Sequence, residues 1–157
     1  MENQPGGLSF RRAQPAEAPI LSEIAFRSKA YWGYDAEFMA KAREELVITA
    51  EAVRTNLIYT AVSDEQRILG FYELTGHPPV IKLSALFIDP AVIRRGIGRK
   101  LFAHALKIAR KMGAKKLLID SDPNAKGFYE SMGAVQMGEV PSGSIPGRML
   151  PLLEIEI

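Results

Sequence analysis

The residues best suited to chemistry lie in the segment 88–101, which reads IDPAVIRRGIGRKL. Gly96 and Gly98 have no Cβ, so a ligand can approach the backbone closely there. Four basic side chains surround these glycines: Arg94, Arg95, Arg99 and Lys100. If a helix opens at the second glycine, its first N–H groups have no partner within the helix and carry partial positive charge. The segment therefore predicts a cradle for a phosphate or pyrophosphate group.

The elements on either side of this loop must fix its position. Residues 80–88 are mostly apolar and predict a buried strand that ends at the Asp89–Pro90 turn. After the glycines, apolar residues recur at helical spacing up to Gly113, which is a typical helix end. Residues 116–120 then predict a second buried strand. Because a helix connects the two strands, we expect them to be parallel.

The remaining pattern predicts further strands and helices. Strands are expected at 8–12, 56–62, 67–74, 134–140 and 148–157, with a turn at 76–79. Helices are expected from about 14 to 31, at 36–46, briefly after Thr49, and at 125–132. Length and composition indicate one α/β domain over residues 8–157, preceded by a flexible tail of residues 1–7.

The composition argues against several classes of protein. The chain has no cysteine, which excludes disulfides, thiolate metal sites and a cysteine nucleophile. Its two histidines are too few for most histidine-based metal sites, so no metal is expected. No apolar run reaches about 18 residues, and residues 1–7 lack the pattern of a signal peptide. We expect a cytoplasmic protein without a membrane partner.

A basic run follows the glycine loop. Residues 94–116 contain nine basic residues and no acidic one, although the net charge is only +2. Such a run could neutralise several phosphates of a nucleic acid and give steep salt dependence. However, the aromatic residues that single-strand binders place between their basic residues are missing. We therefore favour a small anionic ligand and expect no nucleic-acid partner.

The known phosphate-binding loops fit poorly, but one family fits well. A Walker A loop is absent, and Leu101 stands where a Rossmann fingerprint needs its third glycine. The order of strand, Asp-Pro turn, basic Gly-x-Gly loop, helix and strand, followed by NAKGFYESMGA at 124–134, resembles the GCN5-related N-acetyltransferase (GNAT) family over residues 8–157. The family signature is Arg/Gln-x-x-Gly-x-Gly/Ala. Gly96 and Gly98 match it, whereas Ile93 replaces the leading Arg or Gln.

The resemblance implies a fold and a coenzyme. The fold is a mixed, mostly antiparallel sheet, splayed between two parallel strands and flanked by about four helices. Acetyl-CoA is the expected acyl donor, with its pyrophosphate on the loop residues Arg94, Arg95, Gly96, Ile97, Gly98 and Arg99. Its pantetheine arm is expected on the backbone of Leu86, Phe87 and Ile88, where a bulge splays the sheet open and one N–H polarises the thioester carbonyl. Asn124 is a further expected coenzyme contact, with a helix cap as the alternative.

The resemblance also suggests catalytic residues. Tyr129 matches the family tyrosine that lies beside the coenzyme sulfur and protonates the leaving thiolate; its alternative role is packing alone. An ammonium acceptor must lose a proton before it attacks, yet residues 81–86 contain no carboxylate. Glu73, expected in phase with Leu69 and Phe71, and Asp120 are the candidate bases. His77 or a water chain are the alternatives.

The acceptor side is less defined. Tyr31, Trp32 and Tyr34 form an aromatic cluster that could contact the acceptor or simply pack a helix–loop–helix corner. Residues 142–148 form a second candidate acceptor loop, with self-association into a homodimer as its alternative role. We predict acetyl transfer to a small-molecule or peptide amine by direct attack in a ternary complex. A non-catalytic acyl-CoA-binding sensor module is the alternative.

Overall fold

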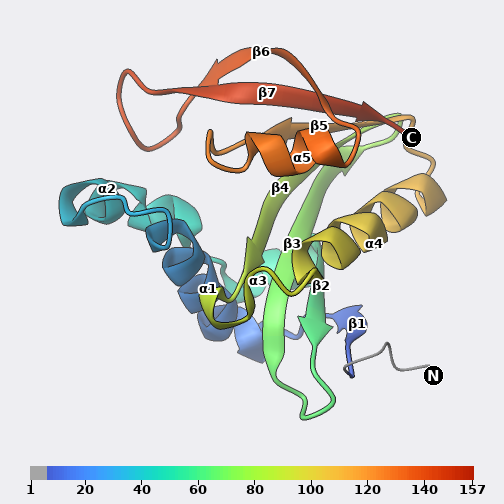
Figure 1. Ribbon diagram of the computed structural model, residues 1–157. Helices are drawn as coiled ribbons and strands as arrows, with labels where there is room; N and C mark the ends of the chain where they lie inside the picture. The colour runs from blue at the N-terminus through green and yellow to red at the C-terminus, as the bar shows by residue number, and fades with distance from the viewer. Residues whose placement is uncertain (1–6) are drawn as a thin grey trace.

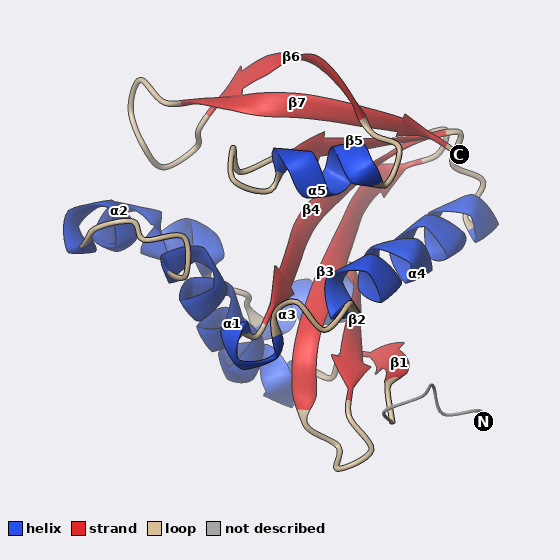
Figure 2. Ribbon diagram, in the orientation of Figure 1, coloured by secondary structure: helices blue, strands red, loops and turns tan. Residues whose placement is uncertain are grey.

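The structure, a computed structural model, describes residues 7–157. The predicted tail lies outside these residues except for Gly7. The described residues form one seven-stranded sheet with five α-helices around it (Figures 1 and 2). The strands are β1 (Ser9–Arg12), β2 (Leu57–Val62), β3 (Ile68–His77), β4 (Val80–Ile88), β5 (Lys116–Asp120), β6 (Val135–Pro141) and β7 (Met149–Glu156). The helices are α1 (Ala18–Ala30), α2 (Ala36–Leu46), α3 (Ala50–Thr55), α4 (Ile97–Lys111) and α5 (Lys126–Ser131).

The sheet order is β1-β2-β3-β4-β5-β7-β6, and every neighbouring pair is antiparallel except β4 and β5. That parallel pair holds only from Val80–Lys116 to Leu83–Ile119, after which the two strands separate. Figure 1 shows β4 running down toward α1 while β5 stays beside β7. The predicted mixed sheet, splayed at a parallel pair, is confirmed.

Each face of the sheet is covered by helices. The amphipathic helix α4 packs on one face through Leu101, Phe102 and Ala105, all fully buried. On the other face, Leu21 and Ile24 of α1 belong to a second core that includes neighbouring parts of α2 and α3. Figure 2 shows α4 and α1 on opposite sides of β3 and β4. Both faces of the sheet are therefore packed beside the point where β4 and β5 separate.

The hairpin before this opening is longer than expected. The strand predicted at 67–74 continues to His77, with Gly76 opposite Ile81 and His77 opposite Val80. The predicted turn at 76–79 is therefore wrong in its first half. The chain reverses at Pro78–Pro79, and since proline cannot donate to a ladder, the pairing stops there rather than earlier.

Two β-bulges decide which way the side chains near the opening face. In β3, Ala61 pairs with Gly70 and Val62 with Ile68, so Leu69 is an extra residue. Leu69 consequently packs with the α4 core, whereas Phe71 packs with the α1 core. The predicted common phase of Leu69 and Phe71 is therefore wrong, because a bulge reverses the alternation between them.

The second bulge lies in β4. Glu73 pairs with Ala85 and Leu74 with Leu83, which leaves Ser84 without a partner. Asp89 N–H donates to Leu69 O at 2.8 Å, so in the alternating ladder the N–H groups of Leu86 and Ile88 point to the opposite edge. That edge faces the space from which β5 has diverged. Within residues 7–157, no strand pairs with these two backbone donors at the opening.

Candidate active site

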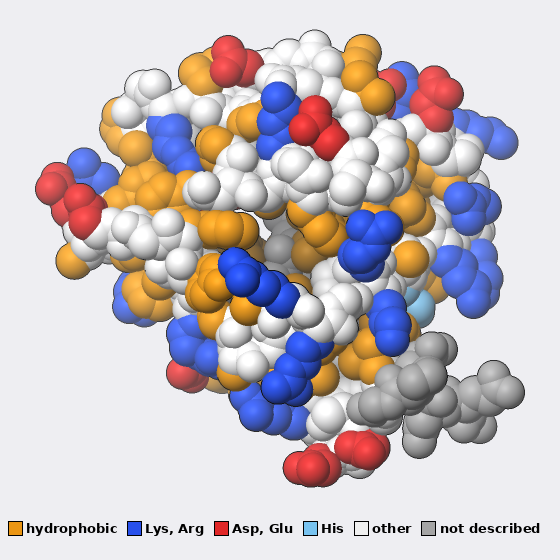
Figure 3. All heavy atoms as spheres, viewed as in Figure 1, with side chains coloured by type: hydrophobic (Ala, Val, Ile, Leu, Met, Phe, Trp, Pro, Cys, Tyr) orange, Lys and Arg blue, Asp and Glu red, His pale blue; other side chains and the backbone are white. Residues whose placement is uncertain are grey.

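A cavity of about 780 Å³ occupies the opening where β4 and β5 separate. Figure 3 shows it as a hollow near the centre of the face viewed, bordered by hydrophobic and basic side chains. One wall comprises the end of β4, the glycine loop and the start of α4. The opposite wall comprises the end of α1, the end of α2, the segment after β5, and the loop between β6 and β7. Because the two walls share one space, two ligands can meet inside it.

The glycine loop forms the turn that the sequence predicted. Arg94 and Gly96 have left-handed φ angles of 69° and 78°, so the chain reverses tightly before α4. The first helical hydrogen bond runs from Lys100 N–H to Gly96 O at 3.2 Å. The N–H groups of residues 97–99 therefore have no carbonyl to bond within the described chain, and these residues line the cavity.

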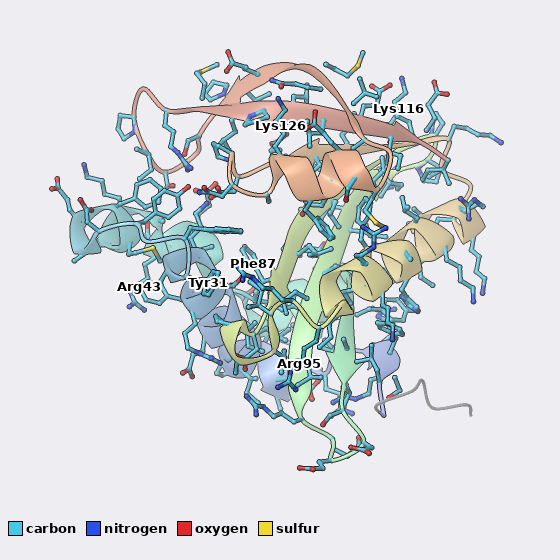
Figure 4. All side chains as sticks on the ribbon, in the orientation of Figure 1. Tyr31, Arg43, Phe87, Arg95, Lys116 and Lys126 are labelled. Atoms are coloured by element: carbon cyan, nitrogen blue, oxygen red, sulfur yellow. The ribbon has the colours of Figure 1, made fainter. Side chains whose placement is uncertain are left out.

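There is room for a ligand beside these amides. A Cβ at Gly96 would meet nothing within 4 Å, and one at Gly98 would meet only the Phe128 ring at 3.6 Å and the Ile88 side chain at 3.8 Å. Arg94 and Arg99 also line the cavity. Arg95 does not, and Figure 4 shows it on the lower side of the loop.

A buried carboxylate anchors this loop. Asp89 is 2% exposed and accepts hydrogen bonds from Arg27 Nη1 at 2.9 Å, Arg67 Nη2 at 3.0 Å and Ala91 N–H at 3.0 Å. The contacts with both arginines and with Ala91 N–H hold the pKa of Asp89 below its usual value despite the opposing effect of burial. Asp89 therefore ties the loop to α1 and to the β2–β3 turn. The turn at Asp89 was predicted from the sequence, but its partners Arg27 and Arg67 were not.

Asp89→Asn is expected to lower the free energy of unfolding by about 2 kcal/mol at pH 7, since it removes a charge from two hydrogen-bonded ion pairs. The native pKa of Asp89 is depressed, so its stabilisation is present above the unfolded pKa of about 3.9 and is lost as the pH falls through the native value. Urea unfolding at pH 7 and at pH 3.5 should show the wild-type advantage shrinking at the lower pH. An advantage that grows toward low pH would contradict this assignment.

Tyr129 of α5 lies on the same cavity. Its side chain is 6% exposed, and within residues 7–157 no hydrogen bond joins its hydroxyl to another group. Every fully buried polar side-chain atom in that range has a hydrogen-bond partner, whereas the Tyr129 hydroxyl has none. The hydroxyl is therefore not fully buried. Burial, and secondarily the nearby Asp122 carboxylate, raises the pKa of Tyr129 well above 10. The phenol is therefore a proton-bearing group that faces a ligand space.

Both candidate bases line the cavity, in different surroundings. Glu73 lies on the Phe71 side of β3, and its Oε2 accepts from the neutral amide of Asn56 at 2.8 Å. Asp120, at the end of β5, forms an ion pair with Lys82 Nζ at 2.7 Å. The Asp120 carboxylate is thus engaged by a cation, whereas the Glu73 carboxylate is held by a neutral amide.

Comparison with known proteins decides the family. Residues 28–142 match the acetyltransferase (GNAT) domain. The chain belongs to the GNAT family. It is 36% identical to the peptidyl-lysine N-acetyltransferase YjaB of Salmonella typhimurium over 152 residues, which cover 94% of this chain and 97% of that protein. It is 28% identical to glucosamine 6-phosphate N-acetyltransferase 1 of Oryza sativa subsp. japonica over 125 residues, 78% of this chain and 70% of the relative. The predicted enzyme class, an N-acetyltransferase, is confirmed.

Solved structures agree on the fold. The solution structure of apo-form YjaB from Escherichia coli is 28% identical and superposes with a TM-score of 0.69, covering 94% of this chain and 95% of that one. The PaiA N-acetyltransferase from Thermoplasma acidophilum, solved in complex with coenzyme A, is 20% identical with a TM-score of 0.76, covering 96% and 99%. Within residues 7–157, no helix of this GNAT protein is long and apolar enough to cross a bilayer.

The aromatic cluster of this GNAT domain divides into two parts. Tyr31 and Trp32 are 43% and 42% exposed and line the cavity mouth; Figure 4 shows Tyr31 near Phe87 at this opening. Tyr34 does not line the cavity. Its ring stacks on Phe38 with 3.9 Å between centroids, and its hydroxyl donates to Asp122 at 2.9 Å. Tyr34 therefore shapes the wall from behind.

Asn124 joins the same polar cluster. Its Nδ2 lies 3.0 Å from both Tyr34 Oη and Asp122 Oδ1, and its backbone N–H donates to Asp122 Oδ1 at 2.8 Å. Asp122 also binds Lys29 of α1 and lies 3.6 Å from Arg148 Nη2 before β7. The lysine and the hydrogen bonds hold the pKa of Asp122 low although burial opposes this, so it is a poor proton acceptor. Arg148 belongs to the loop 142–148 that was predicted on the acceptor side, whereas Lys29, which also lines the cavity, was not predicted.

Proposed function

We propose that this GNAT protein transfers the acetyl group of acetyl-CoA to a primary amine by direct attack within a ternary complex. One observation carries the proposal. A single cavity joins the free amides at the start of α4, the unpaired edge of β4, the Tyr129 hydroxyl and the Glu73 carboxylate. Donor and acceptor therefore have places on opposite walls of the same space, as direct transfer requires.

The coenzyme end follows from the loop. The N–H groups of Ile97, Gly98 and Arg99 are available to donate hydrogen bonds to an anion. The helix dipole favours the negative pyrophosphate at this position. Arg94 and Arg99 add charge from the cavity wall, and Arg95 adds it at longer range. The PaiA structure, which has a similar fold and was solved in complex with coenzyme A, supports the choice of this coenzyme. The Asn124 side chain already bonds to Tyr34 and Asp122, so it can contact the coenzyme only if it gives up one of these bonds.

The thioester end follows from the bulge in β4. The N–H groups of Leu86 and Ile88 face the pantetheine arm, which takes the place of a paired strand. One of them donates a hydrogen bond to the thioester oxygen as negative charge develops there. The Phe87 side chain packs with the α1 core and holds the strand in place.

Glu73 is the base that the contacts favour, with Asp120 second. Glu73 takes a proton from the ammonium group, and the neutral nitrogen attacks the thioester carbon. A C–N bond forms, the C–S bond breaks, and the nitrogen loses its second proton. One proton leaves to solvent through Glu73. The other ends on the coenzyme sulfur, to which Tyr129 Oη donates a hydrogen bond as the thiolate departs.

The acceptor is a primary amine because the named relatives share that chemistry. They act on a peptidyl lysine and on an amino sugar phosphate, both of which present an amine. Tyr31 and Trp32 at the cavity mouth supply apolar surface for the body of such an acceptor.

The test is thiol release from acetyl-CoA with a panel of lysine peptides, amino acids and amino sugars, with acetylated products identified by mass spectrometry. Amine-dependent release supports the proposal. Tight coenzyme binding without release for any amine would instead favour the sensor-module alternative.

Glu73→Gln is expected to lower kcat/KM for the amine about a hundredfold at pH 7, since a positioned base contributes roughly that much. The matched variant Asp120→Asn should cost less than about fivefold, because its carboxylate is already engaged by Lys82. Steady-state rates over pH 6 to 9 check both. A larger loss in Asp120→Asn than in Glu73→Gln would reverse the assignment.

A further inference from the structure

Two cations on the acceptor wall share one carboxylate. Lys29 of α1 and Arg148 before β7 both line the cavity, and both contact Asp122. The three side chains are only 15%, 18% and 12% exposed. Two positive charges and one negative charge leave a surplus of +1 in this partly desolvated cluster. Such a surplus is unfavourable unless a further anion compensates it.

No other carboxylate of the described chain forms an ion pair with either cation. Three more carboxylates line the cavity, on Glu45, Glu73 and Asp120. None of them forms an ion pair with Lys29 or Arg148: Glu73 binds Asn56, and Asp120 binds Lys82. The Tyr34 phenol stays neutral, because burial and its hydrogen bond to Asp122 raise its pKa.

Lys29 and Arg148 have more hydrogen-bond donors than their present partners use. Arg148 Nη2 donates to Tyr34 Oη at 2.6 Å, and its guanidinium lies 5.2 Å from the Tyr34 ring centroid and 4.9 Å from that of Phe38. Lys29 Nζ lies 5.4 Å and 6.0 Å from the same rings. The rings cover one side of the two cations, while both side chains also border the cavity. A guanidinium has five N–H donors and an ammonium three, so several remain for a ligand.

The loop that carries Arg148 is closed on itself. Ser142 N–H donates to Arg148 O at 2.8 Å, and Ser142 Oγ accepts from Ile145 N–H at 3.1 Å and Ser144 N–H at 3.3 Å. Arg148 is therefore presented by a preformed turn, which lowers the entropic cost of binding a ligand there.

We propose that Lys29 and Arg148 form a subsite for an anionic group, a carboxylate or a phosphate, on the amine acceptor. This inference rests on the proposed acetyl transfer and specifies its substrate class. The acceptor carries an anion at one end, on the Lys29–Arg148 pair, and presents its amine to Glu73. The anion has three sources: the carboxylate of an amino acid, an acidic residue beside a lysine in a peptide, or a sugar phosphate.

The test compares acceptors in pairs that differ only in the anion. The pairs are an amino acid and its amide, a lysine peptide with a neighbouring Glu or Gln, and an amino sugar with or without phosphate. We expect kcat/KM to be about tenfold to a hundredfold higher for the anionic member of at least one pair, as for a charge-assisted contact. The preferred pair identifies the source. Equal rates within every pair would overturn the subsite while leaving acetyl transfer intact.

Arg148→Gln and Lys29→Gln should each reduce that preference at least fivefold, because the loss falls mainly on the anionic member of the pair. Arg148→Lys, which keeps the charge, should retain most of the preference. The control Lys41→Gln removes an exposed charge of α2 outside the cavity and should change nothing. If Arg148→Gln slowed neutral and anionic acceptors equally, Arg148 would only support the loop. Absence of thiol release with every amine would refute the acetyl transfer itself, and the subsite with it.

Discussion

Gly98→Asp is expected to abolish coenzyme binding while leaving the free protein at least as stable as the wild type. Gly98 is the second residue of α4, where an acidic side chain interacts favourably with the helix dipole by about 0.3 to 1 kcal/mol. The same carboxylate would stand beside the amides that face the cavity. Like charges 4 Å apart repel by about 4 kcal/mol at an effective dielectric constant of 20, which is roughly a thousandfold in affinity.

Gly98→Ala is the matched control. Its Cβ would make ordinary contacts with Phe128 at 3.6 Å and Ile88 at 3.8 Å, so the fold tolerates it. Calorimetric titration with coenzyme A should show a loss of at most about tenfold for alanine and no measurable binding for aspartate. Thermal unfolding checks that both variants fold. Wild-type affinity in a folded Gly98→Asp protein would place the pyrophosphate elsewhere.

Tyr129→Phe is expected to lower kcat about a hundredfold with little change in coenzyme affinity or stability. The hydroxyl makes no hydrogen bond to another group of residues 7–157, so its removal leaves no orphaned protein group. The substitution keeps the ring, whose centroid lies 5.3 Å from that of Phe102 and 5.1 Å from that of Phe128. The loss should therefore fall on the chemical step.

The pH profile separates this role from that of a titrating acid. Because burial and the Asp122 charge raise the pKa of Tyr129, the phenol stays protonated at neutral and mildly alkaline pH. We therefore expect that ionisation of Tyr129 does not lower the wild-type rate below pH 9. In that range, Tyr129→Phe should not remove any alkaline decline from the pH profile. Stopped-flow single-turnover rates with saturating amine measure the step. An unchanged single-turnover rate would make Tyr129 a packing residue.

Local patterns allowed much of the fold and of the coenzyme site to be predicted. The glycine loop and α4 are encoded within about twenty consecutive residues, and their turn and helix follow the sequence directly. The bulge in β4 at Ser84 was expected only from the family resemblance, and the bulge in β3 was not predicted, because Leu69 carries no local signal for an extra residue. As a result the common phase of Leu69 and Phe71 was wrong.

The charged clusters were harder for a different reason. Asp89 meets Arg27 across 62 residues, and Asp122 meets Lys29 across 93. Arg148 reaches Tyr34 across 114 residues. A single sequence shows which side chains are charged but not which distant charges meet in three dimensions. The aromatic residues and the 142–148 loop of the acceptor wall were therefore predicted, but the cluster around Asp122 that joins them appeared only with the structure.

Backbone amide NMR during titration with coenzyme A tests the central claim most directly, since it reports on the N–H groups themselves. The largest shifts are expected at Ile97, Gly98 and Arg99, with a second set at Leu86 and Ile88, all saturating at one affinity. Coenzyme binding that leaves these five amides unmoved and shifts another surface would contradict the placement of the donor, and with it the route to the amine.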